Sequence, residues 1–251
     1  MTGFEPRVAA ASLSGRSDAE WAAAAATHVG AAFLGGIAVD DPTREAARAL
    51  VARDREEFLP PDPIEFVDRQ VDRLGDVPVR PGVNVRTTSV EPLRSVARVC
   101  DERDAVLELN AHCRQDELCA VGAGESLLAD RERLARYVAV AAEEVPAVSV
   151  KVRTEVDGVD LPATCRAAVD AGAEYVHVDA MDSERVVGAV AEAVDGDAWV
   201  IANNGVRDRE SVTEYLDYGA DAVSVGRPSD DPRVLARVRR ATRDWFAEVT
   251  A

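Results

Sequence analysis

The chain of 251 residues is 47% hydrophobic, which is enough for one large α/β domain with a full core. Its formal net charge of −17 argues against a protein that binds DNA or a membrane surface. The sequence has four cysteines, no basic and apolar leader at its start and no long apolar run, so we expect a cytoplasmic protein without a disulfide framework.

Strands and helices alternate along the chain. In the first part, strands are predicted over residues 8–12 and 31–37, and helices over 18–28, from Asp41 onward, and over 64–74 after a proline cluster. From Gly82 onward the alternation is regular. Strands are predicted at 82–86, 105–110, 147–153, 175–179, 199–203 and 222–225, and helices at 91–103, 130–144, 161–171, 183–194, 209–218 and 231–249.

Eight strands, each followed by helical sequence, favour a closed (β/α)8 TIM barrel over an open sheet, as one domain spanning residues 1–251. The carboxyl ends of the strands then meet on one face. They bring together a polar and basic set: Ser12, Ser14, Asn84, Arg86, Asn110, His112, Cys113, Lys151, Arg153, His177, Asp179, Asn203, Asn204, Gly205, Gly226 and Arg227. The sequence therefore predicts a positive pocket for an anion at the barrel mouth.

The acidity of the chain has two interpretations. Lys151 is the only lysine, and this acid-rich, lysine-poor composition resembles that of proteins from halophilic microbes. In molar salt the Debye length falls to roughly 3 Å, so that net charge says little about partners. The charge therefore indicates either the partners that the protein avoids or the salt in which it works.

Two features of the strand ends indicate ligand binding. Lys151 ends a buried strand where arginine would preserve the charge, which favours a ligand contact with a compact ammonium group over a chance survivor or an ordinary ion pair. The turns 203–205 and 226–227 follow the last two strands, where many barrels bind phosphate on backbone N–H groups. Either turn alone is a common loop, but the two together predict phosphate binding.

Cys113 is open to three interpretations. Free cysteines are usually core residues, but the flanking His112 and Arg114 favour a reactive or proton-donating thiol. A metal site built from His112, Cys113 and Cys119 is the third interpretation, although its spacing fits no common zinc pattern and no fourth ligand is evident. We therefore predict no metal.

As a group, these motifs resemble those of the FMN-dependent tRNA-dihydrouridine synthases and their archaeal barrel relatives, with the dihydroorotate dehydrogenases as more distant cousins. The similarity runs from about Gly82 to Pro228. The motifs agree with the family in order and spacing. The family's strand ending N-x-G-C-P corresponds to residues 110–114, and its glycine-rich stretch with paired leucines corresponds to 122–128. Its K-x-R motif corresponds to 151–153 and its histidine to His177. Its N-G and G-R turns correspond to 204–205 and 226–227.

The resemblance implies an FMN-dependent oxidoreductase acting on CH-CH groups, with NAD(P)H as the electron source. The substrate would be a uracil-like ring, in tRNA or as a free pyrimidine, with Cys113 as the catalytic proton donor and Lys151 beside the flavin or the substrate carbonyl. The implied FMN contacts are Ser12, Arg86, Asn110, Lys151, His177, Asn204, Gly205, Gly226 and Arg227. The implied substrate contacts are His112, Arg114 and Arg153.

The chain also departs from the family pattern. His112 and Arg114 replace a glycine and a proline, Arg86 stands where a flavin-contacting glutamine is expected, 177–179 lacks a glycine-arginine pair and 11–15 replaces a proline-methionine turn. The C-terminal helical domain with which synthases bind tRNA is not expected either. Two alternatives therefore stay open: a flavin-free lyase or isomerase of a sugar phosphate that uses Lys151 as base or Schiff-base amine, and a non-catalytic nucleotide-binding barrel.

Overall fold

The computed structural model describes residues 3–181 and 183–249, and within them eight parallel strands close into a barrel in sequence order. The strands are β1 (Val8–Ala10), β2 (Ala31–Ala38), β3 (Arg80–Arg86), β4 (Val106–Asn110), β5 (Val148–Arg153), β6 (Tyr175–Asp179), β7 (Trp199–Asn203) and β8 (Ala222–Val225). β8 pairs with β1 and closes the ring. The predicted (β/α)8 barrel of the α/β class is confirmed.

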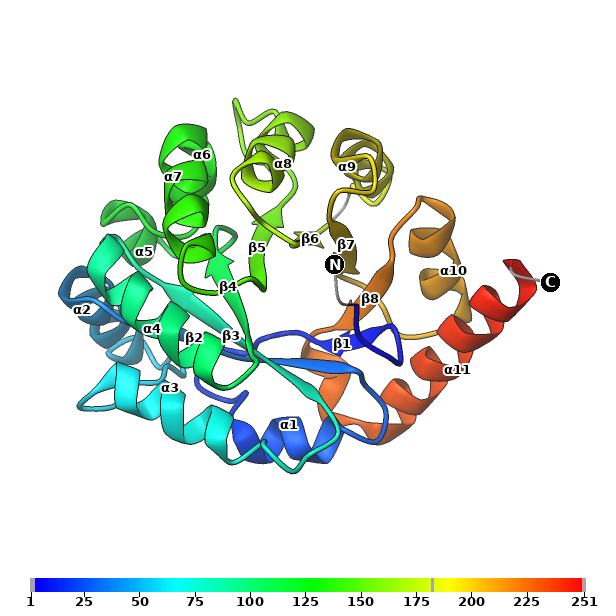
Figure 1. Cartoon of the computed structure of the whole chain (residues 1–251), viewed down its shortest axis with the longest axis horizontal. Coiled ribbons are helices and arrows are strands. Elements are labelled where there is room, and N and C mark those ends of the chain that lie inside the picture. The colour runs from blue at the N-terminus through cyan, green and yellow to red at the C-terminus, as the bar shows by residue number, and fades with distance from the viewer. Residues whose placement is uncertain (1–2, 182, 250–251) are drawn as a thin grey trace.

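Helices surround the barrel (Figure 1). They are α1 (Ala19–Ala25), α2 (Asp41–Val51), α3 (Pro63–Asp72), α4 (Val90–Glu102), α5 (Asp116–Ala120), α6 (Glu125–Ala129), α7 (Arg131–Ala142), α8 (Leu161–Asp170), α9 (Val186–Val194), α10 (Arg209–Asp217) and α11 (Pro232–Val249), with a 3-10 helix, η1, at Arg227–Asp230. Among the described residues, no helix combines the length and the apolar character needed to cross a membrane.

Aspartate side chains cap many of these helices. The carboxylates of Asp18, Asp40, Asp62, Asp130, Asp160 and Asp208 each accept a hydrogen bond from a backbone N–H of the first helical turn. A carboxylate at this position also interacts favourably with the helix dipole. Part of the negative charge of the chain therefore stabilises helix starts.

The connection from β4 to α7 differs from the expected loop because it contains the short helices α5 and α6. Five-residue helices show too little hydrophobic periodicity to be detected in a sequence. Gly124, with φ +61°, lies between them, and a Cβ there would come within 2.1 Å of the Cys113 carbonyl oxygen. The glycine therefore allows α6 to start directly against the Cys113 loop.

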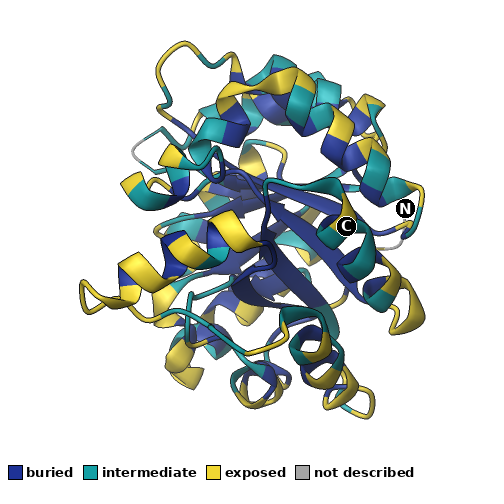
Figure 2. Cartoon of the chain, turned by 90° about the vertical axis from the view of Figure 1, so that its left-hand side faces the viewer, coloured by how far each residue is buried: buried dark blue, intermediate teal, exposed yellow. Residues whose placement is uncertain are grey.

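The interior of the barrel has an apolar floor and a polar upper layer. Phe33, Val106, Tyr175 and Ile201 are among the buried side chains that pack together as the floor. Above them lie side chains with 0% exposure: Asn84, Glu108, Ser149, His177 and Ser224. Figure 2 shows the strands buried along their length, with the exposed residues on the outer faces of the helices and in the loops. The polar layer therefore belongs to the barrel core.

We expect Phe33→Ala to lower the free energy of unfolding by about 3–5 kcal/mol, because it leaves a cavity in the floor of the barrel. Phe33 is 1% exposed, and its ring packs where a Cβ at Gly82 would lie, 2.4 Å from Cδ1. Urea unfolding measures the change. The control Val249→Ala, at a residue 65% exposed, should change the free energy by less than about 0.5 kcal/mol. Equal values for the two variants would contradict the floor assignment.

Candidate active site

A buried carboxylate lies at the centre of the polar layer. Glu108 Oε1 accepts a hydrogen bond from Asn84 Nδ2 at 2.8 Å, and Glu108 Oε2 accepts one from Ser149 Oγ at 3.1 Å. His177 Nδ1 lies 2.7 Å from the same Oε2. A buried carboxylate is costly unless such partners surround it. Glu108 was missed by the sequence analysis, although a glutamate between the buried Leu107 and Leu109 is a signal that could have found it.

The charges in this layer define the tautomer of His177. Burial raises the pKa of Glu108, but His177 and Lys151 outweigh it, and the pKa of the carboxyl is lowered. Burial lowers the pKa of His177. The neutral imidazole therefore donates from Nδ1 to Glu108 and accepts at Nε2 from Ser224 Oγ at 2.7 Å. Ser224 Oγ in turn accepts from Asn203 Nδ2 at 2.7 Å.

A second chain of hydrogen bonds leads from Glu108 toward Cys113. Asn84, which donates to Glu108, accepts from Asn110 Nδ2 at 2.8 Å through its own Oδ1. Asn110 Oδ1 accepts the backbone N–H groups of Cys113 at 3.2 Å and of His112 at 3.4 Å. These bonds attach the Cys113 loop to the end of β4.

His112 and Lys151 lie close together at the mouth of the barrel. Lys151 is 2% exposed, and its strand neighbours in register are Asn110 and His177. Burial and nearby positive groups, with Lys151 first among them, lower the pKa of His112 well below its ordinary value. The imidazole of His112 is therefore neutral in the folded protein near pH 7.

Arg86 crosses the mouth from β3. Its side chain is 1% exposed, Nη1 donates to Glu57 Oε2 at 2.5 Å, and Nη2 donates to Ser14 Oγ. Burial opposes the charge of Arg86, but the adjacent Cys113 side chain and the Glu57 carboxylate outweigh it and raise the pKa of the guanidinium. Among the residues that the structure describes, Arg86 Nε has no hydrogen-bond partner. A Cβ at Gly36 would lie 2.9 Å from this atom.

The prediction of a positive pocket needs a correction, because acidic groups neutralise two of its cations. Arg86 pairs with Glu57, whose side chain is 3% exposed. Arg153 Nη1 pairs with Glu125 Oε2 at 2.9 Å. Glu57 follows α2 and Glu125 starts α6, so neither acid stands at a strand end. Their approach to the mouth depends on tertiary packing, which the strand pattern does not reveal.

The two turns after β7 and β8 leave their backbone open. Asn204 and Gly205 have positive φ values of 98° and 65°, and the Asn204 carbonyl oxygen accepts from the Tyr215 hydroxyl at 2.9 Å. A Cβ at Gly226 would meet no atom within 4 Å, and Arg227 beside it is exposed. Open backbone N–H groups beside an arginine suit a phosphate group.

The remaining predicted residues differ in their placement. Ser12 is partly exposed in the loop after β1, and it is Ser14 of the same loop that contacts Arg86. Arg114 is exposed next to the buried Cys113. The structure thus brings Arg86, Asn110, Cys113 and Lys151 together at the mouth and places Arg114 on the solvent side of the Cys113 loop. His177 lies in the polar layer beneath them, with both ring nitrogens bonded to Glu108 and Ser224.

Within residues 3–181 and 183–249, no cluster of three or more His, Cys, Asp or Glu side chains is arranged to hold a metal. Cys119 Sγ lies 3.6 Å from the carbonyl oxygen of Cys113, not toward a metal-binding set.

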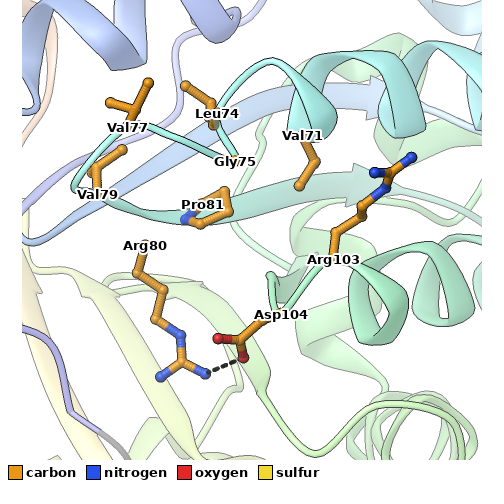
Figure 3. A pocket seen from close by; sticks show the side chains of 9 residues that line it. All are labelled: Val71, Leu74, Gly75, Val77, Val79, Arg80, Pro81, Arg103 and Asp104. Atoms are coloured by element: carbon orange, nitrogen blue, oxygen red, sulfur yellow. Dashed lines mark ion pairs between the residues drawn. The ribbon is translucent and has the colours of Figure 1, made fainter.

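A separate pocket of about 420 Å³ is lined by residues at the end of α3, the start of β3 and the end of α4 (Figure 3). Arg80 and Asp104 approach each other there, with 3.8 Å between Nη2 and Oδ1.

The closed barrel and the polar groups at the carboxyl ends of its strands define a (β/α)8-barrel protein with a candidate ligand site at its mouth. The family model described as dihydrouridine synthase (Dus) matches residues 82–250. The chain therefore belongs to the dihydrouridine synthase family. The resemblance found in the motifs is confirmed.

The relatives of this chain are distant in sequence. An uncharacterised protein of Methanocaldococcus jannaschii is 24% identical over 239 residues, which cover 89% of each chain. DHODH from Eimeria tenella, solved in complex with ferulenol, has a TM-score of 0.70 at 16% identity and covers 98% of this chain and 83% of its own. A thiamine phosphate pyrophosphorylase from Pyrococcus furiosus has a TM-score of 0.55 at 13% identity, with coverages of 95% and 96%. At these identities the solved structures support the fold alone.

We expect the protein to lose stability on mild acidification. The pKa values of His112 and His177 are lowered by burial, so below about pH 6.5 the unfolded chain binds protons that the folded chain does not. Their contribution to stability is therefore present above this pH and falls as the pH decreases, by up to about 1.4 kcal/mol per pH unit for each imidazole. Urea unfolding between pH 7.5 and 5.5 measures this slope.

The variant His112→Gln should make the slope shallower. His28→Gln is the matched control, because His28 lies after α1 and outside the polar layer. A wild-type stability that is constant between pH 7.5 and 5.5 would show that the imidazoles of His112 and His177 are not held neutral.

Proposed function

We propose that the protein is an FMN-dependent oxidoreductase that reduces the C=C bond of a uracil-like pyrimidine. The proposal rests on three neighbouring residues of the mouth: Lys151, Asn110 and Cys113. Asn110 and Lys151 are partners in the register of β4 and β5, and Asn110 binds the backbone of Cys113. Membership of the dihydrouridine synthase family supports an oxidoreductase built on these groups.

The residues present fit FMN. The open backbone at Gly205 and Gly226 and the charged fork of Arg227 suit its phosphate. The buried Nε of Arg86, which has no partner among the described residues, supplies a donor for a polar edge of the flavin ring. Lys151 and Asn110, on the neighbouring strands β5 and β4, would hold the ring or the substrate carbonyl. When bound, FMN supplies the hydride for the reduction.

Cys113 would provide the proton that balances this reduction. Its thiol proton goes to one carbon of the substrate double bond, while the neighbouring carbon receives the hydride. The loop holds the thiol in place, because the Cys113 N–H donates to Asn110 and the Cys113 carbonyl oxygen accepts from the N–H of Glu125 at 2.8 Å. Cys113 is 8% exposed, which limits its contact with water.

The substrate would enter from the rim above Cys113. Neutral His112 can donate or accept a hydrogen bond with a pyrimidine edge, and exposed Arg114 suits a phosphate outside the mouth. Arg153 stays paired with Glu125 beside them. The proposed substrate is thus a uracil-type ring in tRNA or a free pyrimidine, and NAD(P)H is the proposed source of electrons.

Purified protein should bind FMN near stoichiometry and show a flavin absorbance spectrum. Arg227→Ala should weaken binding by about ten- to a hundredfold, the effect of losing a charged hydrogen bond. Fluorescence titration measures the affinity. Arg233→Ala, on the exposed side of α11, is the control and should leave it unchanged. A colourless protein that ignores added FMN would refute the proposal, and borohydride trapping of a sugar phosphate on Lys151 would favour a lyase instead.

Cys113→Ala should bind FMN as the wild type does and lose about 10²- to 10⁴-fold in turnover, the usual contribution of a positioned acid. Dihydropyrimidine formation from NAD(P)H is the measurement, with free uracil compounds and with unmodified tRNA as substrates. Cys119→Ala is the matched control, because it removes a second thiol of the same loop, one that contacts the Cys113 carbonyl and the start of α6. Full turnover by Cys113→Ala would remove this thiol from the mechanism.

Deletion of the gene separates the two substrate forms. Loss of dihydrouridine from bulk tRNA in the deleted strain would identify tRNA as the substrate. Unchanged tRNA, together with reduction of a free pyrimidine by the purified protein, would identify the free ring.

A further inference from the structure

Three hydrogen-bond donors face the buried carboxylate of Glu108. They are Asn84 Nδ2 at 2.8 Å, Ser149 Oγ at 3.1 Å and His177 Nδ1 at 2.7 Å. The glutamate is ionised, because His177 and Lys151 overcome the effect of burial on its pKa. An ionised carboxylate accepts hydrogen bonds and donates none. Each group around it must therefore turn a donor toward Glu108.

This requirement orients two amides in succession. Asn84 turns its NH2 group toward Glu108, so that its oxygen faces Asn110 and accepts from Asn110 Nδ2 at 2.8 Å. Asn110 then turns its oxygen away from Asn84 and toward the Cys113 loop, where this oxygen accepts a hydrogen bond from the Cys113 N–H at 3.2 Å. The two ends of an amide look alike in shape, and the partners decide which way it points. The charge of Glu108 thus sets which group donates and which accepts in every hydrogen bond from Glu108 to Cys113.

We propose that Glu108 is a positioning residue: its negative charge fixes the orientation of the Asn84 and Asn110 amides and thereby holds the Cys113 loop in place. The catalytic meaning of this arrangement rests on the proposed function, in which Cys113 is the proton donor. The positioning itself needs no flavin, because it consists of hydrogen bonds between residues of the protein.

The same carboxylate also orients the opposite side of the barrel. It accepts a hydrogen bond from His177 Nδ1–H, and His177 Nε2 then accepts one from Ser224 Oγ. Ser224 Oγ in turn accepts from Asn203 Nδ2. Asn203 directly precedes the turn of Asn204 that is proposed to hold phosphate. One charge therefore orders both the Cys113 loop and the strand end that leads into a phosphate turn.

Glu108→Gln tests the proposal because it changes the charge and leaves the shape almost unaltered. If the new amide turns its oxygen to His177 and Ser149, its NH2 group faces the NH2 group of Asn84. Asn84 must then reverse, Asn110 must reverse in response, and Asn110 Nδ2 meets the N–H of Cys113. Two donors cannot bond to each other, so the Cys113 loop loses its attachment to β4.

A second substitution should restore the order of donors and acceptors that leads to Cys113. In the double variant Glu108→Gln with Asn84→Asp, the carboxylate stands at position 84, one step closer to Cys113 in the series of hydrogen bonds. It accepts from the new amide on one side and from Asn110 Nδ2 on the other, so Asn110 again presents its oxygen to Cys113. The double variant has the same net charge as the wild type, and a general effect of charge on the fold is therefore excluded.

The rate of alkylation of Cys113 by iodoacetamide reports on the loop without flavin. A Cys119→Ser background leaves Cys113 as the most accessible thiol, since Cys100 and Cys165 are 0% and 1% exposed. Glu108→Gln should raise the rate about tenfold, the effect of one lost hydrogen bond on the opening of the loop. The double variant should return it to the wild-type rate. Ser149→Ala removes a donor to Glu108 that does not lie between Glu108 and Cys113 in the series of hydrogen bonds. It should therefore leave the alkylation rate unchanged.

Circular dichroism establishes that each variant is folded. A folded Glu108→Gln protein with the wild-type rate, or a double variant that stays as fast as the single one, would overturn the proposal. If Glu108→Gln does not fold, Asn84→Ala replaces it, because it interrupts the same chain and leaves the His177 and Ser149 contacts intact. An unchanged rate in that variant would also overturn the proposal. An FMN titration of the same proteins separates the two ideas, since absent FMN binding refutes the proposed function and leaves the alkylation comparison valid.

Discussion

A carboxylate that is buried at the centre of a barrel must be surrounded by donors, and this requirement shapes the interior of the protein. Glu108 has 0% exposure, and β3, β5 and β6 supply an amide, a hydroxyl and an imidazole to it. Leaving such a group unpaired would cost several kcal/mol. The inner faces of β3, β4, β5, β6 and β8 are therefore polar at this level, in contrast to the apolar floor below. The groups at the mouth rest on this layer.

The fold follows from the sequence to a large extent, and the reasons are local. β6, β7 and β8 have the predicted bounds, because short apolar runs there are framed by glycine or acidic turns and by helices of ordinary length. The strand ends of a parallel barrel must meet, so the group of Asn110, Cys113 and Lys151 could also be predicted. The partners Glu57 and Glu125 could not, because they come from segments whose path depends on packing between elements far apart in the chain.

The differences from the family pattern at the mouth are linked to one another. An arginine at position 86 is a permanent charge in a place with 1% exposure, and it needs an acid nearby to be stable there. Glu57, after α2, supplies that acid, and Ser14, after β1, binds the second nitrogen. Two segments far from Arg86 in the sequence thus support its charge. The mouth of this barrel therefore depends on contacts between distant segments, whereas the layer beneath it follows from a single charge.

The absence of a side chain at Gly36 has a consequence for how this protein can change. A Cβ there would lie 2.9 Å from Arg86 Nε and 2.9 Å from Asn84 Oδ1, in a region where neither group can move away. Any larger residue at position 36 would push against the guanidinium and the first amide of the chain that leads to Cys113. Position 36 therefore accepts only glycine while Arg86 and Asn84 both stand beside it, and a redesign of this position must change both neighbours with it.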